Sequence, residues 1–292
     1  MQILIGIVFF AFFLCICIIG YDTNRFVVRK YQFQNEKITD TFQFVLVSDL
    51  HNKSYGKKNE KLLKAIEKLN PDAVLCAGDM LTAKPERDFH TAVEFMSALA
   101  KKYPIYYGNG NHEYRLKLYP EVYGNMAERY EQELKKADIE PLVNQKKVVS
   151  DKNIVIYGLE IGREYYKRFQ KRNMETEYIP SLLGQADNQA CNILLAHNPE
   201  YFQQYADYGA DFVLSGHVHG GVARIPILGG VISPSLHIFP KYDGGVFRKR
   251  RSDGASTIMI LSRGLGTHTI PVRFCNPGEL IEITISPKRE KP

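Results

Sequence analysis

The sequence predicts an α/β protein that carries more than one sheet in a single domain, preceded by an N-terminal transmembrane helix. Three observations support this prediction. Residues 3–20 contain no charged side chain, short apolar runs then alternate with amphipathic runs, and β-forming runs crowd together in the last third of the chain. Strands that alternate with helices predict a sheet covered by helices, and the later strands indicate a further sheet.

The first element is the apolar run "ILIGIVFFAFFLCICIIG", which is long enough to cross a hydrocarbon core of ~30 Å. Only Met1 and Gln2 precede it, and no small-residue cleavage pattern follows. Residues 1–20 are therefore predicted to be a retained single-pass anchor rather than a cleaved signal peptide. Arg25, Arg29 and Lys30 come next, so the positive-inside rule predicts that the domain after the helix lies on the cytoplasmic side of the membrane, with the extracytoplasmic face as the alternative.

The rest of the chain divides into three parts. Residues 21–41 are predicted to be a polar tether, 42–286 the folded domain and 287–292 a C-terminal tail. Strands are predicted at 42–48, 73–78, 104–108, 153–160, 191–197 and 211–217, where β-formers make compact apolar runs. Helices are predicted at 57–70, 90–102 and 120–138, the first with Leu62, Ile66 and Leu69 at helical spacing and Pro71 closing it. Further β-forming runs follow at 223–228, 256–262 and 280–285.

Charge and cysteine usage exclude some classes of protein. The chain of 292 residues has 38 basic and 32 acidic side chains, and this surplus of +6 is too small to indicate nucleic acid. No nucleic-acid partner is expected, and the chain is expected to be a monomer. The five cysteines form neither a disulfide framework nor a C-x-x-C zinc pattern, so they are interpreted as small buried apolar residues.

Polar side chains gather where the predicted strands end. They are Asp49 and His51, then Asp79, then Asn111, His112 and Glu113, then His197, and finally His217 and His219. Carboxyl ends of strands are where α/β proteins bind ligands. Each residue alone would serve equally as a turn, cap or core residue. Together, so many polar groups would carry desolvation costs unless they met a cation, so the set favours a metal site.

The types of residue narrow the metal and the chemistry. Imidazole nitrogens mixed with carboxylate and amide oxygens suit Mn, Fe, Zn or similar ions better than Ca or Mg alone. Each carboxylate oxygen of Asp79 can take a different metal, and two metals ~3.5–4 Å apart are an established arrangement for phosphate-ester hydrolysis. We therefore expect two divalent metal ions as cofactors, with manganese first and Fe or Zn as alternatives.

In its motifs the sequence resembles the calcineurin-like metallophosphoesterase family, whose series is D-x-H, G-D, G-N-H-(D/E), a lone H and G-H-x-H. All five blocks are present in order: Asp49-Leu50-His51, Gly78-Asp79, Gly110-Asn111-His112-Glu113, His197 and Gly216-His217-Val218-His219. The stretches "HGGVARIP", "FPKYDGG" and "SRGLGTHTIPVRFCNPGE" further resemble a YkuE-like, membrane-anchored bacterial subgroup. The resemblance implies a two-sheet α/β/β/α sandwich, the metallophosphoesterase fold.

The resemblance also implies a role for each residue. One metal would be held by Asp49, His51, Asp79 and His219, and the other by Asp79, Asn111, His197 and His217. His112 would bind no metal, but would contact the phosphate and act as the general acid. The implied enzyme is a metal-dependent phosphoesterase that hydrolyses phosphate mono- or diester or pyrophosphate bonds with a metal-activated hydroxide. Glu113 would either orient His112 or be a solvated carboxylate at a helix start.

Two basic segments bear on the substrate. In the insertion 162–188, Tyr165, Tyr166 and Phe169 interleave with basic residues, and a second basic run covers 248–251. Both are either solvated loops or contacts to anionic lipid, in which case the substrate is lipid-linked. Arg263 would either contact the phosphate or form a structural salt bridge. The alternatives to a phosphoesterase of this kind are a nuclease of the same superfamily and a non-catalytic metal-binding scaffold.

Overall fold

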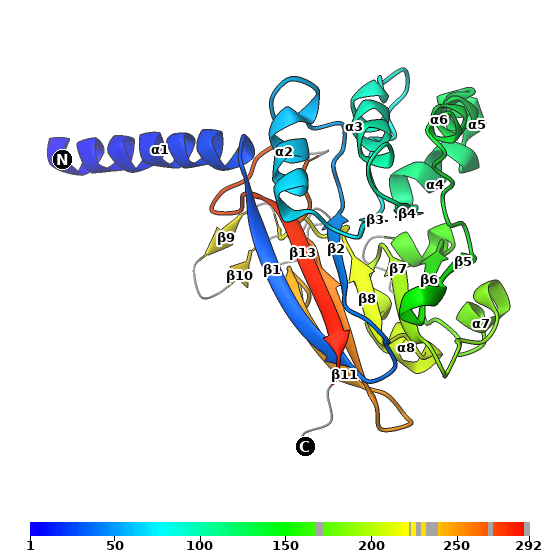
Figure 1. Cartoon of the computed structure of the whole chain (residues 1–292). Helices are drawn as coiled ribbons and strands as arrows, with labels where there is room; N and C mark the ends of the chain where they lie inside the picture. Colours follow the sequence, from blue (N-terminus) through cyan, green and yellow to red (C-terminus); the bar gives the residue numbers. More distant parts are fainter. Residues whose placement is uncertain (168–171, 222, 226–228, 232–238, 268–270, 289–292) are drawn as a thin grey trace.

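Two β-sheets form the centre of the protein (Figure 1). This computed structural model describes residues 1–167, 172–221, 223–225, 229–231, 239–267 and 271–288. The five-stranded sheet has the order β1–β13–β2–β3–β4, and the six-stranded sheet has the order β11–β12–β8–β7–β6–β5. A short β9–β10 ribbon, Arg224–Ile225 and Gly229–Gly230, lies beside the end of the N-terminal helix (Figure 1). The predicted α/β fold with two sheets is confirmed.

The strands of the five-stranded sheet come from both ends of the chain. They are β1 (Phe26–Asn35), β2 (Phe42–Val47), β3 (Ala73–Ala77), β4 (Ile105–Gly108) and β13 (Gly278–Pro287). Strands β2, β3 and β4 are parallel, whereas β13 lies antiparallel to β2 and parallel to β1. The three parallel strands therefore bring their carboxyl ends to one edge, where the polar residues follow.

The six-stranded sheet has parallel strands in its centre. Its members are β5 (Gln145–Val149), β6 (Ile154–Leu159), β7 (Cys191–Ala196), β8 (Phe212–Ser215), β11 (Gly245–Arg250) and β12 (Ser256–Leu261). Strands β6, β7, β8 and β12 are parallel to their neighbours, and the edge strands β5 and β11 are antiparallel. Strands β7 and β8 deliver the later histidines of the motif series.

Helices cover the outer face of each sheet. The helices and short 3-10 turns on the side of the first sheet are η1 (Lys57–Asn59), α2 (Glu60–Leu69), α3 (His90–Ala100), α4 (Asn111–Leu118), α5 (Pro120–Tyr123) and α6 (Met126–Lys135). Those on the second sheet are η2 (Ser150–Lys152), η3 (Arg163–Tyr166), α7 (Tyr178–Leu183), η4 (Pro199–Tyr201) and α8 (Phe202–Tyr208). Leu62 and Ile66 show why α2 forms here, since its apolar face is buried against the sheet.

Three apolar layers hold these elements together. The middle layer lies between the two sheets and joins residues of the first sheet, such as Phe44 and Ile283, with residues of the second, such as Ile193 and Leu214. An outer layer packs α2, α3 and α6 on the first sheet, and the other packs α7 and α8 on the second. This order of layers is the predicted α/β/β/α sandwich.

The N-terminal helix α1 (Gln2–Thr23) projects away from the sandwich (Figure 1). It continues to Thr23, beyond the predicted end at residue 20. Its apolar side chains are exposed, and it is long and apolar enough to cross a membrane. Asp22 is the one buried residue of this helix.

The prediction of a polar tether at residues 21–41 is wrong for β1. That strand pairs with β13 in parallel register from Phe26 opposite Gly278 to Asn35 opposite Pro287. The physical reason is that successive side chains of a strand point to opposite faces of the sheet. Tyr31 and Phe33 turn toward the apolar layer between the sheets, while Lys30, Gln32 and Gln34 are exposed. The sheet thus begins directly after the apolar helix α1, and β13 extends into the predicted tail as far as Pro287.

The basic run 248–251 is not a loop, because residues 248–250 belong to β11. Lys249 donates to Gln203 (2.9 Å) and Arg251, just after the strand, pairs with Asp211 (3.4 Å), whereas Arg248 and Arg250 are exposed. In the insertion, Tyr165 is buried and packs on Tyr178 and Tyr201. The basic side chains of Arg163, Lys167 and Arg172 are exposed. Residues 168–171, including Phe169, lie outside the described residues.

Candidate metal centre

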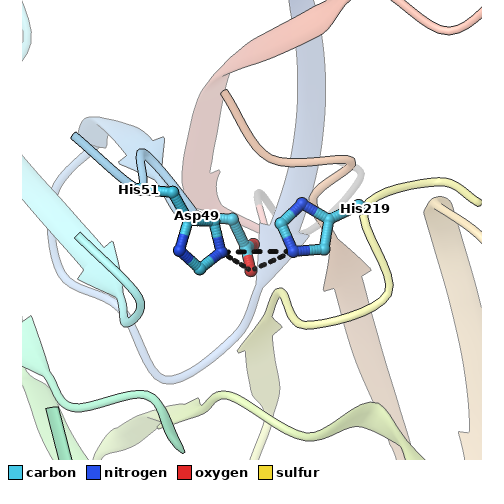
Figure 2. A group of neighbouring side chains, drawn as sticks. All are labelled: Asp49, His51 and His219. Atoms are coloured by element: carbon cyan, nitrogen blue, oxygen red, sulfur yellow. Dashed lines mark hydrogen bonds and ion pairs between the residues drawn. The ribbon is translucent and has the colours of Figure 1, made fainter. Parts of the chain in front are cut away.

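Every residue singled out at the strand ends lies at the same edge of the two sheets. Three groups have ligand atoms within 4.8 Å of one another: Asp49, His51 and His219 (Figure 2); His51, Asp79 and His112; and Asp79, His197 and His217. Asn111 is the first residue of α4 and directly precedes His112. Residues from β2, β3, β7, β8 and α4 therefore converge although they are far apart in the sequence.

Asp79 lies in the middle of this cluster. Its Oδ2 atom is 3.1 Å from Nε2 of His197, 3.7 Å from Nε2 of His51 and 4.0 Å from Nε2 of His112. Its Oδ1 atom accepts a hydrogen bond from the backbone amide of His112 (2.8 Å). Oδ2 of Asp79 thus faces both His51, expected to bind one metal, and His197, expected to bind the other. This is the position that a bridging ligand requires.

Asp49 is the second buried carboxylate. Its Oδ1 atom is 3.5 Å from Nε2 of His219 and accepts the backbone amide of His217 at 3.0 Å. The other oxygen accepts the hydroxyl of Ser48 at 2.5 Å. These bonds fix the carboxylate and leave Oδ1 facing the His219 ring.

The hydrogen-bond partner of Nδ1 decides what each histidine ring can offer to the cluster through Nε2. Nδ1 of three rings faces a backbone carbonyl: His51 faces Leu81 (3.2 Å), His197 faces Ala77 (2.6 Å) and His219 faces Gly266 (3.1 Å). A carbonyl only accepts, so Nδ1 carries a proton in each case, and Nε2 is the nitrogen that a neutral ring would offer to a metal as a lone pair. Such a carbonyl partner is typical of histidines that bind metal through the other nitrogen.

His112 has the opposite arrangement. Its Nδ1 atom accepts a hydrogen bond from the backbone amide of Ala83 (2.8 Å), so the proton of the ring is on Nε2. That N–H points into the cluster, 4.0 Å from Oδ2 of Asp79. His112 therefore presents a proton donor where the three other rings offer Nε2 as a possible metal ligand.

Oδ1 of Asn111 is buried and lacks a hydrogen-bond partner among the described residues. The neighbouring Asn109 is satisfied differently, because its Nδ2 donates to Glu160 at 2.8 Å. A buried amide oxygen without a partner is costly in a protein interior unless a cation binds it. The donor set thus fits divalent metal ions.

The backbone at the site is unusual. Asp49, His51, Asp79, His217 and His219 have φ values of 50°, 49°, 56°, 76° and 54°, in the left-handed region that L-residues rarely adopt. Strained residues of this kind cluster at functional sites, where the surrounding structure holds them. Gly216 lets the backbone before His217 pass close to Ser48, because a Cβ atom at residue 216 would lie 2.0 Å from Oγ of Ser48.

Glu113 is 3% exposed, so the expectation of a solvated carboxylate is wrong. One oxygen accepts the backbone amides of Asp79 and Gly110 (both 2.9 Å), and the other accepts the amide of Met80 and the hydroxyl of Tyr107 (both 2.8 Å). Glu113 therefore ties the turn that carries Asp79 to the start of α4, which carries Asn111 and His112.

The buried charged groups of the cluster shift the pKa values of one another strongly. Burial raises the pKa of Asp49 to about 7, with Asp79 adding to the effect and His197 opposing it. Burial acts in the same direction on Asp79, but the neighbouring imidazoles of His197, His112 and His51 outweigh it and hold its pKa well below the usual range. Burial alone would lower the pKa of His197, yet Asp79 and Asp49 raise it to about 10. Without metal, His197 and Asp79 therefore form an ion pair.

Other residues bear on the site in ways that sequence reasoning missed or left open. The stem of Arg263 packs over Gly220, while its guanidinium lies near Glu279, Arg224 and Arg29 rather than among the metal-site histidines. Tyr166 lies edge-on to the ring of His217, with centroids 5.4 Å apart. The buried Asn276 and Arg273 support the His219 loop, and no role in the site was predicted for them from the sequence.

The chain belongs to the calcineurin-like phosphoesterase family, because the model of that family matches residues 42–221. The predicted family is confirmed. The matched region contains all the residues of the cluster, from Asp49 to His219.

Several curated relatives are metallophosphoesterases by name. The "Transmembrane protein with metallophosphoesterase domain" of Danio rerio is 25% identical over 83% of this chain, and the chain spans only 53% of that relative. The "Uncharacterized metallophosphoesterase YkuE" of Bacillus subtilis is 31% identical over 35% of this chain and 34% of its own length. The "UDP-2,3-diacylglucosamine pyrophosphatase LpxG" of Chlamydia trachomatis is 25% identical over 82% of each chain.

Proposed function

We propose that this chain is a metal-dependent phosphoesterase that hydrolyses phosphate mono- or diester or pyrophosphate bonds. One divalent ion would be held by Asp49, His51, Asp79 and His219, and the other by Asp79, Asn111, His197 and His217. The observation that carries this proposal is the direction of the rings: three histidines hold Nδ1 on a carbonyl oxygen and turn Nε2 to the cluster as a possible metal ligand, whereas His112 accepts an amide at Nδ1 and turns an N–H to the cluster. A site that only stored metal would have no need of that proton donor.

The metals and the protein would supply different parts of the chemistry. When bound, two divalent cations lower the pKa of a water molecule and neutralise phosphoryl oxygens. The protein holds its ligands in fixed directions through the carbonyls of Leu81, Ala77 and Gly266. Because these contacts are in place before a substrate arrives, the site would bind the phosphate without reorganising its own dipoles.

His112 would act on the leaving group. Its Nε2–H is the atom that faces the cluster, and a phosphate bound there would bring the leaving oxygen within reach. The imidazole would give its proton to that oxygen as the P–O bond breaks. Glu113 would contribute indirectly, because it fixes both the Asp79 turn and the start of α4.

We propose further that the enzyme works at a membrane surface on a lipid-linked phosphate ester or pyrophosphate. The apolar helix α1 supports this location, and the name of the relative LpxG, a UDP-2,3-diacylglucosamine pyrophosphatase, supports this class of substrate. Arg25 follows the helix and favours a cytoplasmic domain. Protease treatment of intact cells tests the orientation: a domain that is cleaved without lysis lies on the extracytoplasmic face instead.

The activity can be tested with the full chain in detergent, assayed on bis-p-nitrophenyl phosphate with Mn²⁺. Asp79→Asn should abolish hydrolysis, because Asp79 faces both halves of the site. Asp253→Asn, which changes an exposed aspartate, should behave as wild type. An inactive wild type, or an Asp79→Asn variant as active as wild type, would rule out the phosphoesterase.

A second assay separates the substrate classes. Wild-type protein is given soluble nucleotides, single-stranded DNA and a lipid-linked diphosphate in mixed micelles. Preference for the lipid-linked compound supports work at the membrane surface. Cleavage of DNA alone would indicate a nuclease, and Mn²⁺ binding without turnover of any substrate would indicate a scaffold.

A further inference from the structure

The end of the membrane helix is bonded into the loop before β13. Asp22, in the last turn of α1, is 3% exposed, and its Oδ2 atom accepts the backbone amide of Asn276 at 3.1 Å. Its Oδ1 atom pairs with Arg25 at 2.8 Å. Thr23 adds a second tie, because its hydroxyl accepts the backbone amide of Arg273 at 3.3 Å. The helix exit is therefore attached to residues 273–276.

Asn276 in turn holds the backbone of the His219 loop. Its fully buried Nδ2 atom donates to the carbonyl oxygens of His219 (2.8 Å) and Gly221 (2.7 Å). His219, Gly220 and Gly221 have φ values of 54°, 71° and 83°. Successive left-handed residues build no regular helix or strand, so side-chain bonds of this kind have to fix the turn.

Arg273 holds the ring of the same histidine. It is 1% exposed, and its Nη2 atom donates to the carbonyl oxygen of Gly266 at 2.7 Å. That oxygen also accepts the Nδ1 proton of His219 at 3.1 Å. Both the backbone and the ring of His219 are thus supported from residues 273–276, the segment that Asp22 and Thr23 tie to the membrane helix.

We propose that Asn276 is a positioning residue for His219, and that Asp22 at the exit of the membrane helix holds Asn276 in place. The membrane helix is then part of the support of the metal centre, not only an anchor. Asn276 acts through the carbonyls that fix the His219 turn and touches no substrate. This proposal rests on the two-metal centre of the proposed function.

The test measures metal binding to the full chain in nanodiscs, by calorimetry with Mn²⁺ and by electron paramagnetic resonance. In Asn276→Ala, one of two Mn²⁺ ions should bind about 10–100-fold more weakly, the usual loss when an outer partner of a metal ligand is removed. The spin-coupled signal of the paired ions should give way to the signal of an isolated ion. Asp22→Ala should shift the affinity in the same direction, whereas Asp22→Asn keeps an acceptor oxygen and should bind as wild type.

Asn192 provides a matched control. It is 1% exposed, and its Nδ2 atom also donates to two carbonyl oxygens, those of Asp187 (2.7 Å) and Gly209 (3.2 Å). It lies near the start of β7, at the end of the strand away from His197. Asn192→Ala should lower the melting temperature of the metal-free protein, yet leave both Mn²⁺ affinities and the coupled signal unchanged.

Three results would overturn the proposal. The first is wild-type Mn²⁺ affinity in Asn276→Ala, and the second is an equal loss of affinity in Asn192→Ala. If Asn276→Ala does not fold, the Asp22 variants test the proposal instead. Wild-type Mn²⁺ affinity in Asp22→Ala is then the third result that would overturn it. A wild-type chain that binds no Mn²⁺ overturns the proposed function itself, and is thereby distinguished from failure of the positioning role alone.

Discussion

Nε2 of His51 and Nε2 of His219 face each other at 3.3 Å, although the two residues lie 168 positions apart in the chain. The Nδ1 protons of both rings are directed to carbonyl oxygens, those of Leu81 and Gly266. Two lone pairs at this distance repel each other unless a proton or a metal ion lies between them. The folded protein is therefore built to gain stability from a cation.

The first prediction follows from this pair. Each Mn²⁺ ion at 100 times its dissociation constant should stabilise the fold by about 2.7 kcal/mol, so two ions should give about twice that, since the unfolded chain has no such sites. Thermal unfolding with Mn²⁺ and with EDTA measures the difference. In the double variant His51→Ala with His219→Ala, the part of the Mn²⁺ stabilisation that comes from the ion between these rings should be lost. A full response in that variant would show that this pair does not bind metal.

A second prediction concerns His112. Replacing it with alanine should lower kcat by roughly 10²–10⁴-fold, the contribution typical of a general acid. Two metals should remain bound, as measured by elemental analysis. The loss should be larger for alkyl phosphates than for p-nitrophenyl phosphates, because a poor leaving group depends more on protonation. An equal loss for both substrates would argue against proton donation.

A third prediction concerns Glu113. In Glu113→Gln, an amide NH₂ would face backbone N–H groups that now donate to a carboxylate oxygen. Leaving buried donors unsatisfied costs about 1–3 kcal/mol, so urea unfolding of the metal-free protein should show a loss of that order. Glu128→Gln changes an exposed glutamate on α6 and should stay within about 0.5 kcal/mol of wild type. Equal effects in the two variants would contradict the role of Glu113.

The fourth prediction is a pH dependence of the metal-free protein. The folded pKa of Asp49, about 7, lies above its unfolded value, so Asp49 favours the fold below pH 3.8 and this contribution is lost as the pH rises through 7. The folded pKa of His197, about 10, also lies above its unfolded value, so its contribution is complete below pH 6.5 and is lost as the pH rises through 10. Asp79 has a lowered pKa, so its contribution is lost only in acid below pH 3.8.

In EDTA, the melting temperature should therefore fall from pH 5 to pH 9. In Mn²⁺ the stabilisation should grow over the same range, because the metal displaces protons from its ligands. Asp49→Asn should flatten the EDTA curve between pH 5 and pH 7. A curve in EDTA that rises with pH equally in wild type and Asp49→Asn would contradict these shifts.

Much of the site could be predicted because its residues follow directly after strands. Asp49, Asp79 and His197 come at the ends of apolar runs, and parallel strands bring such ends together without further information. Which nitrogen of each histidine ring carries the proton could not be predicted in this way. That choice depends on carbonyls such as those of Leu81 and Gly266, which reach the rings only through loops whose paths no local pattern fixes.

Strands β1, β5, β10 and β11 were not predicted from the sequence, and β1 and β11 were missed for a common reason. In β1, the alternation around Tyr31 and Phe33 is diluted by charged and amide side chains, because one face of this edge strand meets water. In β11, the basic run hides the strand in the same way, with Arg248 and Arg250 exposed. Asn276 was missed because its partners lie more than 50 positions away, and nothing in its own neighbourhood of the sequence indicates them.

The pairing of β1 with β13 has a consequence for biosynthesis. Strand β1 leaves the ribosome right after the apolar helix α1, but its partner β13 is made much later. At about 5–20 residues per second, the ~250 residues between them take roughly 13–50 s to synthesise. During that time β1 is an unpaired edge, and β2 lacks the neighbour that lies between it and β1. Translation of β13 is thus the event that closes the first sheet, and a nascent chain stopped before residue 278 leaves that sheet open.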